Sequence, residues 1–313
     1  MAYRARRKRN AIALPSNGPL LKRFLGKLPF RLTRAQSRAM AQILRDLAVP
    51  HPMQRLLQGD VGSGKTIVAA IGCLAAVDAG CQAAVMAPTE ILAEQHLRKF
   101  SEWLAPLGVT IAWLHGGLAA ADRKRELKRL QNPEPLIAIG THALFQKKVE
   151  FARLALAVVD EQHRFGVQQR LALRKKVEAD LMPHQLMMSA TPIPRTLSMS
   201  YYADLDVSTI DELPPGRRGV ATRLVSGGRR AEVLARIRAA CAEGQQAYWV
   251  CPVIEESKEG DLQTAVDTFE SLQKELKCLR VGLLHGRLPA HEKASVMKAF
   301  VQGKLNLLVA TTV

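Results

Sequence analysis

The sequence predicts an α/β fold built from parallel sheets that helices cover on both faces. From residue 55 onward, short apolar runs alternate with segments of helical length. The runs are continuously apolar rather than alternating, as expected for strands that are covered on both faces. The Pro-Pro-Gly core of DELPPGRRG (211–219) interrupts this order, which restarts at residue 220. A length of 313 residues is enough for two such units.

The elements follow in order along the chain. In the first unit we expect strands at 55–58, 82–87, 109–115, 136–139, 156–160 and 185–190, and the segment 207–210 precedes the linker. In the second unit we expect strands at 220–225, 246–251, 279–284 and 305–310, with helices at 229–243, near 264–276 and at 289–302. The domain boundaries that follow are a basic linker-like arm (1–27), a first lobe (28–210), a linker (211–219) and a partial second lobe (220–313).

The net charge of +17 points to a polyanionic partner, but its distribution is uneven. Twelve Lys or Arg residues precede the first acidic residue, Asp46, whereas the rest of the chain carries 33 basic and 28 acidic side chains. The body of the protein is therefore only mildly basic. The first 27 residues are expected to be an exposed arm.

The cysteine pattern and the hydropathy indicate in which cellular compartment the protein is expected. The five cysteines form no C-x-x-C pair, which is typical of reduced thiols in a cytoplasmic protein. The longest apolar run, 67–77, has eleven residues and is too short to span a membrane. We expect a cytoplasmic protein with no membrane partner.

The segment GDVGSGKT (59–66) matches the complete phosphate-binding pattern G-x-x-x-x-G-K-[ST] between an expected strand and an expected helix. Its glycines (Gly59, Gly62 and Gly64) and Ser63 let backbone N–H groups close around phosphate oxygens. Lys65 would reach the β and γ phosphates, and Thr66 would offer a hydroxyl to Mg²⁺. The pattern predicts a P-loop NTPase that uses ATP and Mg²⁺.

A second acidic site follows the expected strand at 156–160. Asp160 would bind Mg²⁺, and Glu161 would orient or deprotonate the water that attacks the γ-phosphate. Read alone, an Asp-Glu pair after a strand is often only a helix cap. Together with the P-loop it favours ATP hydrolysis over phosphoryl transfer to a metabolite.

The tetrad Asp160-Glu161-Gln162-His163 resembles the D-E-x-H box of superfamily 2 helicases and translocases, and adds His163 to the catalytic candidates. This resemblance implies two RecA-like lobes, the second incomplete. It also implies roles for residues in motifs that follow in the expected order: Gln36 reads adenine, Thr89, Thr141 and His285 contact DNA, and Ser189 and Thr191 couple the ATP site to the DNA groove. Thr89 and Thr141 are also ordinary helix-cap candidates.

Several longer stretches narrow the resemblance to the RecG family of branch-migrating DNA helicases. They are GDVGSGKT, APTEILAEQH, GTHALFQ, VVDEQHRFGVQQR, SATPIPRTLSMSYYADLDVSTIDELPPGR, YWVCPVIEES and LLHGR. The motor of the transcription-repair translocase Mfd shares some of them and is the alternative. The resemblance implies action on forked or four-way DNA junctions in recombination and repair, by a monomer. It also implies a wedge domain and last motor motifs that this sequence lacks, so a nucleotide- and DNA-binding remnant without turnover is a further hypothesis.

Overall fold

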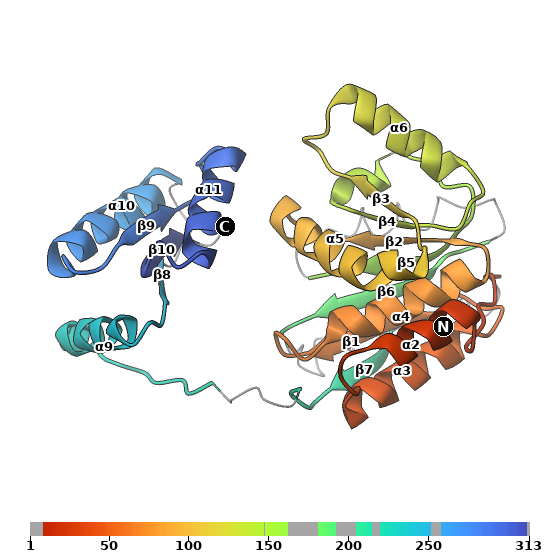
Figure 1. The fold of residues 1–313 in the computed structure, drawn as a ribbon, viewed down its shortest axis with the longest axis horizontal. Coiled ribbons are helices and arrows are strands. Elements are labelled where there is room, and N and C mark those ends of the chain that lie inside the picture. Colours follow the sequence, from red (N-terminus) through yellow and green to blue (C-terminus); the bar gives the residue numbers. More distant parts are fainter. Residues whose placement is uncertain are drawn as a thin grey trace. The chain divides into compact units, whose positions relative to one another are not determined.

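The computed structural model describes residues 9–146, 148–161, 181–191, 205–214, 220–251 and 258–311. The chain separates into two compact units, Met1–Arg218 and Gly219–Val313. This division falls inside the segment 211–219, where the sequence predicts the linker. Each unit is an α/β layer structure (Figure 1), so the predicted fold class is confirmed.

The first unit contains a seven-stranded parallel sheet in the order β3-β4-β2-β5-β6-β1-β7. Its strands are β1 (Gln54–Gly59), β2 (Gln82–Met86), β3 (Ile111–Leu114), β4 (Ile137–Gly140), β5 (Leu154–Val159), β6 (His184–Ser189) and β7 (Asp206–Ile210). The six predicted strands of this unit are present, with ends that differ by one or two residues, and β7 is a further strand that was not among them. Every residue of β2, β4, β5 and β6 is buried, as the continuous apolar runs predicted.

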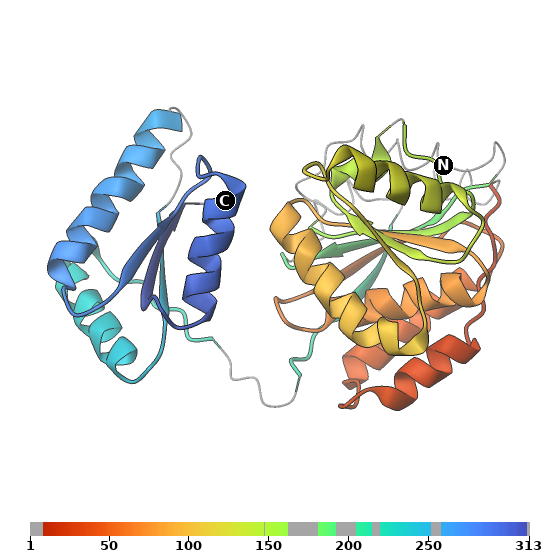
Figure 2. The same ribbon diagram turned by 45° about the horizontal axis from the view of Figure 1, so that its top comes forward.

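Helices cover both faces of this sheet (Figure 2). On one face lie α4 (Lys65–Asp78) and α5 (Glu90–Leu104), which is followed by the 3₁₀ turn η1 (Ala105–Leu107), and α2 (Pro19–Lys27) and α3 (Arg34–Leu47) pack on the outside of α4. The other face packs against α6 (Ala120–Gln131) and the 3₁₀ turn η2 (His142–Phe145). Helix α4 is apolar around its whole circumference, because it lies between the sheet and the outer helices α2 and α3.

Residues 9–27 differ from the expected exposed arm. Leu14, Leu21 and Phe24 are buried in the core of the first unit. The carboxylate of Asp78 accepts hydrogen bonds from the backbone N–H groups of Leu20 and Leu21, and so caps α2. The linker-like interpretation is therefore wrong for this stretch, because its apolar residues share one face while its charges share the other.

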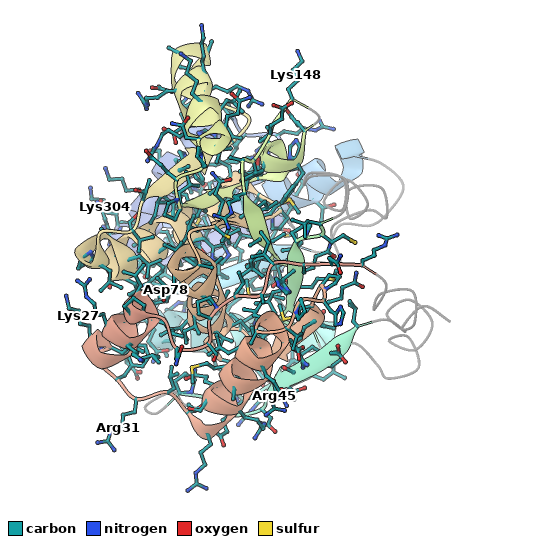
Figure 3. All side chains as sticks on the ribbon, turned by 90° about the vertical axis from the view of Figure 1, so that its right-hand side faces the viewer. Lys27, Arg31, Arg45, Asp78, Lys148 and Lys304 are labelled. Atoms are coloured by element: carbon teal, nitrogen blue, oxygen red, sulfur yellow. The ribbon has the colours of Figure 1, made fainter. Side chains whose placement is uncertain are left out.

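The basic residues of this region lie on the surface of the first unit. Arg9, Lys22, Arg23, Lys27, Arg31, Arg34, Arg38 and Arg45 are all exposed. Figure 3 shows Lys27 and Arg31 extending away from the layer formed by α2 and α3. Most of these basic side chains lie on the exposed faces of α2 and α3, whose opposite faces are apolar and buried. High charge and a buried apolar face therefore occur in the same segment.

The second unit contains a three-stranded parallel sheet in the order β8-β10-β9, formed by β8 (Ala247–Cys251), β9 (Val281–Leu284) and β10 (Leu307–Thr311). The 3₁₀ turn η4 (Gly227–Arg229) leads into α9 (Arg230–Ala242), which covers one face of the sheet together with α10 (Lys258–Glu275). The other face packs against α11 (Ala290–Val301). Within the residues described, no helix is both long and apolar enough to cross a membrane.

The strand predicted at 220–225 is wrong. These residues form no strand, and Val220 and Leu224 are 84% and 102% exposed. The segment has two apolar pairs, Val220-Ala221 and Leu224-Val225, on either side of two polar residues, but none of its side chains is buried on this unit. A β-like pattern without a neighbouring strand to pair with does not form a strand.

Candidate nucleotide-binding site

Three neighbouring strands bring the principal motifs to one edge of the first sheet. Strand β6 lies between β1 and β5 and is parallel to both. The P-loop follows β1, the Ser189 motif ends β6, and Asp160 follows β5. Because the carboxyl ends of parallel strands meet at the same edge, motifs separated by about a hundred residues in sequence become neighbours.

The P-loop owes its conformation to glycines at positions that other residues rarely adopt. Gly62 and Gly64 have φ angles of 74° and 91°. A Cβ atom at Gly64 would also lie 2.3 Å from the side-chain nitrogen of Gln36. Helix α4 begins immediately afterwards at Lys65, so the free N–H groups of its first turn are directed toward the loop.

The Lys65 ammonium folds over the P-loop. Its Nζ donates hydrogen bonds to the carbonyl oxygens of Gly59, at 2.6 Å, and Asp60, at 3.1 Å. Burial lowers the pKa of Lys65, and the nearby carboxylates of Asp160 and Glu161 oppose this change. A cation held close to two carboxylates in a partly buried site is well placed to neutralise phosphate charge.

Both carboxylate oxygens of Asp160 accept a hydrogen bond. Oδ1 accepts from the backbone N–H of Glu161 at 3.0 Å, and Oδ2 lies 2.7 Å from Nε2 of His96. Glu161 itself has a φ of 48° and is the one non-glycine residue with positive φ in the described backbone. Such a conformation costs free energy, and it is often found at functional sites.

Gln36 braces the P-loop from the side. Its side-chain oxygen accepts from the backbone N–H of Thr33, while its side-chain nitrogen donates to the carbonyl of Ser63 at 2.7 Å. The Thr33 hydroxyl accepts from the backbone N–H of Gln36, which completes a capping box at the start of α3. Both ends of the side-chain amide are thus engaged by protein groups, although Gln36 still borders the cavity.

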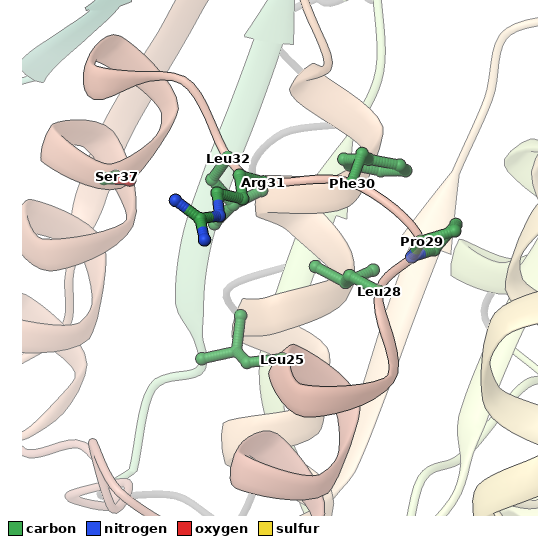
Figure 4. Close-up of a pocket in the computed structure, with 7 residues that line it drawn as sticks. All are labelled: Leu25, Leu28, Pro29, Phe30, Arg31, Leu32 and Ser37. Atoms are coloured by element: carbon green, nitrogen blue, oxygen red, sulfur yellow. The ribbon is translucent and has the colours of Figure 1, made fainter.

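These residues line one cavity of about 730 Å³ in the first unit. Its walls include the predicted residues Gln36, Gly62, Gly64, Lys65, Thr66, Asp160 and Glu161, together with Phe30, Gln95, His96, Lys99 and Trp103. Gly59 and Ser63 lie in the same loop but do not line it. A smaller cavity of about 360 Å³ shares Phe30 and Arg31, which lie on the loop between α2 and α3 (Figure 4).

The donor set in this cavity fits a Mg²⁺–nucleoside triphosphate. Thr66 and Asp160 supply the hydroxyl and carboxylate oxygens that Mg²⁺ prefers, beside a cationic Lys65 for phosphate. In the adjacent loop, the buried hydroxyl of Ser63 is one of three buried side-chain atoms without a hydrogen-bond partner in the described part of the chain. An apolar wall around a few converging polar groups is typical of a ligand site.

Thr89 and Thr141, which the sequence predicts to contact DNA, lie outside the cavity lining. Thr89 is the half-buried N-cap of α5, where its hydroxyl accepts from the N–H of Leu92. Thr141 caps η2 and is only 5% exposed, with its hydroxyl accepting from the N–H of Ala143 and its own N–H bonded to the carbonyl of Leu114. The structure therefore shows both threonines as caps, at the carboxyl ends of the adjacent strands β2 and β4.

The Ser189 and Thr191 hydroxyls lie 3.0 Å apart at the end of β6, and Ala190 between them lines the cavity. His285 follows β9 in the second unit, and its Nδ1 is buried without a hydrogen-bond partner. His163 lies outside the described residues.

Three contacts were not expected from the sequence. His96, within the APTEILAEQH stretch, reaches Asp160 from α5. Glu212, in the predicted linker, accepts from the N–H of Ala35 at the start of α3, and Asp211 pairs with Arg38 at 2.6 Å. The sequence around Asp211, Glu212 and His96 does not indicate which distant residues they contact.

Comparison with known proteins places this site in a family. Residues 33–200 match the DEAD/DEAH box helicase family model. The chain is 54% identical to the ATP-dependent DNA helicase RecG of Pasteurella multocida, covering 97% of the chain and 44% of that protein. It is 51% identical to RecG of Escherichia coli K12, covering 100% of the chain and 46% of that protein. The chain thus spans less than half the length of these relatives.

Solved structures agree. A structure of RecG bound to a three-way DNA junction matches 99% of this chain and 40% of its own, with a TM-score of 0.80 and 41% identity. Yeast Dbp5 bound to RNA and ADP BeF₃ matches 94% of this chain and 73% of its own, with a TM-score of 0.66 at 19% identity, and supports the fold alone. The predicted RecG resemblance is confirmed, and the chain belongs to the DEAD/DEAH box helicase family, within which it is similar to RecG helicases.

Proposed function

We propose that this chain is the ATP-driven motor part of a RecG-like helicase that acts on branched DNA. The observation that carries the proposal is the cavity in which Lys65, Thr66, Asp160 and Glu161 converge. The similarity to RecG, including a RecG structure bound to a three-way junction, supports the choice of branched DNA. The +17 net charge, with its basic residues exposed on α2 and α3, favours a polyanionic partner.

Each residue of the cavity has a separate role in the proposed hydrolysis of ATP. Lys65 exchanges its carbonyl partners for the β and γ phosphate oxygens of ATP. Thr66 and Asp160 would hold Mg²⁺, which neutralises phosphate charge when it is bound. Glu161 orients the attacking water and accepts its proton. Gln36, which already holds Ser63 of the P-loop, is placed to contact the adenine.

The remaining assignments concern DNA and coupling. The N-termini that follow Thr89 and Thr141 offer backbone N–H groups to DNA phosphates, which binds the strand without reading its sequence. His285 is proposed as a contact from the second unit. Ser189, Thr191 and His163 are proposed to couple hydrolysis to DNA movement, and the motor to act as a cytoplasmic monomer.

DNA-stimulated phosphate release tests the ATPase assignment. We expect Lys65→Ala and Glu161→Gln to abolish turnover, because one removes phosphate binding and the other the group that activates water. Glu161→Gln should still bind ATP. Lys304→Ala, a change of an exposed lysine between α11 and β10 (Figure 3), serves as the matched control. Turnover that survives Lys65→Ala would refute the assignment, whereas ATP and DNA binding without turnover in the wild-type chain would indicate a binding remnant.

Binding to a forked duplex, compared with a linear duplex of equal length, tests the DNA assignment. We expect tighter binding to the fork. For either DNA, affinity should fall at least about tenfold between roughly 50 and 200 mM salt, because phosphate contacts release counterions. An affinity that hardly changes with salt would refute the proposed backbone contacts.

A further inference from the structure

The contact between His96 and Asp160 is the strongest feature of the cavity that the proposed reaction does not use. His96 lies on α5 and is 6% exposed, and its Nε2 is 2.7 Å from Oδ2 of Asp160. The side chains of the pair are 8% and 13% exposed. A short contact between two groups shielded from water is worth more than a surface ion pair, so it is able to fix a side-chain conformation.

The geometry of Asp160 shows what this contact does. The other oxygen, Oδ1, is held by the backbone N–H of Glu161. With one donor on each oxygen, the carboxylate plane is fixed from both sides, and each oxygen keeps a lone pair for a further partner. Both His96 and Asp160 border the cavity that also holds Thr66 and Lys65. The free lone pairs are therefore close to the place where the proposed Mg²⁺ would be held.

We propose that His96 is a positioning residue that orients the Asp160 carboxylate for the divalent cation of the ATP site. This inference rests on the proposed function and adds to it a residue outside the P-loop and the acidic tetrad. Partners that orient a metal ligand commonly change metal affinity 10- to 100-fold when they are removed. The competing explanation is that His96 only packs α5, where its ring meets Phe100 edge-on at 6.4 Å and 85°.

Three substitutions of His96 separate these explanations. His96→Ala removes the hydrogen bond. His96→Gln places an amide nitrogen about as far from the backbone as Nε2 and restores a donor to Asp160. His96→Asn has the same amide but reaches only as far as Nδ1, so it should fail to restore the contact. Phe100→Leu is the packing control, because it loosens α5 beside His96 without touching Asp160.

The primary measurement is equilibrium binding of fluorescently labelled ADP by the full chain, first in EDTA and then with increasing Mg²⁺. We expect His96→Ala to leave the affinity in EDTA within about twofold and to raise the Mg²⁺ concentration needed for half of the metal-dependent gain by about 10-fold or more. His96→Gln should recover most of this shift and His96→Asn little of it. Phe100→Leu should lower the thermal midpoint and leave the Mg²⁺ requirement unchanged.

A second readout is the Mg²⁺ dependence of DNA-stimulated hydrolysis. A positioning role predicts that His96→Ala raises the Mg²⁺ concentration for half-maximal rate far more than it lowers the rate at saturating Mg²⁺. An unchanged Mg²⁺ requirement in His96→Ala, in a chain whose ADP binding depends on Lys65, would overturn this inference and leave the proposed function standing. Equal shifts in Phe100→Leu and His96→Ala would assign the effect to packing. Failure of the wild-type chain to bind labelled ADP would overturn both proposals.

Discussion

The two compact units use the same layered architecture but cover their sheets to different extents. In the first unit, β2, β4, β5 and β6 are buried along their whole length. In the second unit, the central strand β10 is buried at four of its five residues, but the edge strand β8 leaves Tyr248 and Val250 57% and 59% exposed. The candidate site lies at the end of the covered strands, where closely packed neighbours hold its groups in place. Interior strands that are covered on both faces thus preorganise the site, whereas an edge strand such as β8 leaves apolar side chains exposed.

The largest expected consequence is that the two units unfold separately. Because, among the residues that the structure describes, the second unit buries fewer apolar side chains in its core clusters, we expect it to open at lower urea concentration and to be digested first by a protease. The first transition should also have the smaller dependence on urea, by roughly twofold, since this dependence scales with the surface that unfolding exposes. A single cooperative transition, or equal protease resistance of both units, would contradict the comparison.

A matched pair of core truncations tests whether the two units unfold independently. Leu57→Ala in β1 and Leu307→Ala in β10 each remove a side chain that is fully buried. Each should reduce the free energy of unfolding of its own unit by about 3 kcal/mol, through lost burial and the cavity that remains. Separate urea transitions measure the two losses. A change in the transition of the other unit would show that the units are energetically coupled.

The sequence predicted strands best where burial alone decides them. Six of the seven strands of the first sheet were predicted, because a run of apolar residues between turn signals has few other uses in an α/β chain. The strand at 220–225 was wrong because strand formation there depends on a distant partner that local pattern does not reveal. The same limit explains residues 9–27, where the number of positive charges concealed the apolar stripe of Leu21 and Phe24.

A substitution at Asp78 tests whether α2 is packed on the first unit, in contrast to the exposed arm predicted for residues 1–27. Asp78 accepts hydrogen bonds from two N–H groups at the start of α2, and a Cβ atom at Gly18 would collide with its side chain. Asp78→Ala should therefore reduce the stability of the first unit by about 1 to 2 kcal/mol, measured by urea unfolding. Substitution of Glu102, an exposed carboxylate on α5 that pairs with the exposed Lys99 on the same helix, should cost well under 1 kcal/mol. Similar effects of the two changes would mean that α2 is not docked through Asp78.

The sequence predicted those residues of the candidate site that belong to contiguous motifs. Lys65, Thr66, Asp160 and Glu161 belong to such motifs, and the structure brings them to one cavity. The partners of these residues were not predictable in the same way. The contact of His96 with Asp160 joins positions 64 residues apart, and Gln36 holds Ser63 from another helix. Both contacts depend on how helices pack around the sheet, which no local spacing specifies.

The smallest expected effect concerns proton linkage at His184, at the start of β6. The ring is fully buried, with Nδ1 accepting from the backbone N–H of Met53 at 3.0 Å and Nε2 donating to the carbonyl of Ile12 at 2.8 Å. Burial lowers the pKa of His184, whereas its hydrogen bond to Ile12 opposes the change. The neutral ring suits this arrangement, because a proton on Nδ1 would face the N–H of Met53.

The sign of the pH dependence follows from the lowered pKa. The unfolded state takes up a proton at a higher pH than the folded state does, so stability falls as the pH decreases. His184 contributes its full stabilisation above its unfolded pKa of about 6.5 and loses it progressively as the pH falls from there through the lower folded pKa. Urea midpoints of the first unit between about pH 8 and about pH 5.5 should show this loss. His184→Gln should flatten that part of the profile, with the transition of the second unit as the internal reference, and an unchanged slope in the variant would assign the acid sensitivity to other groups.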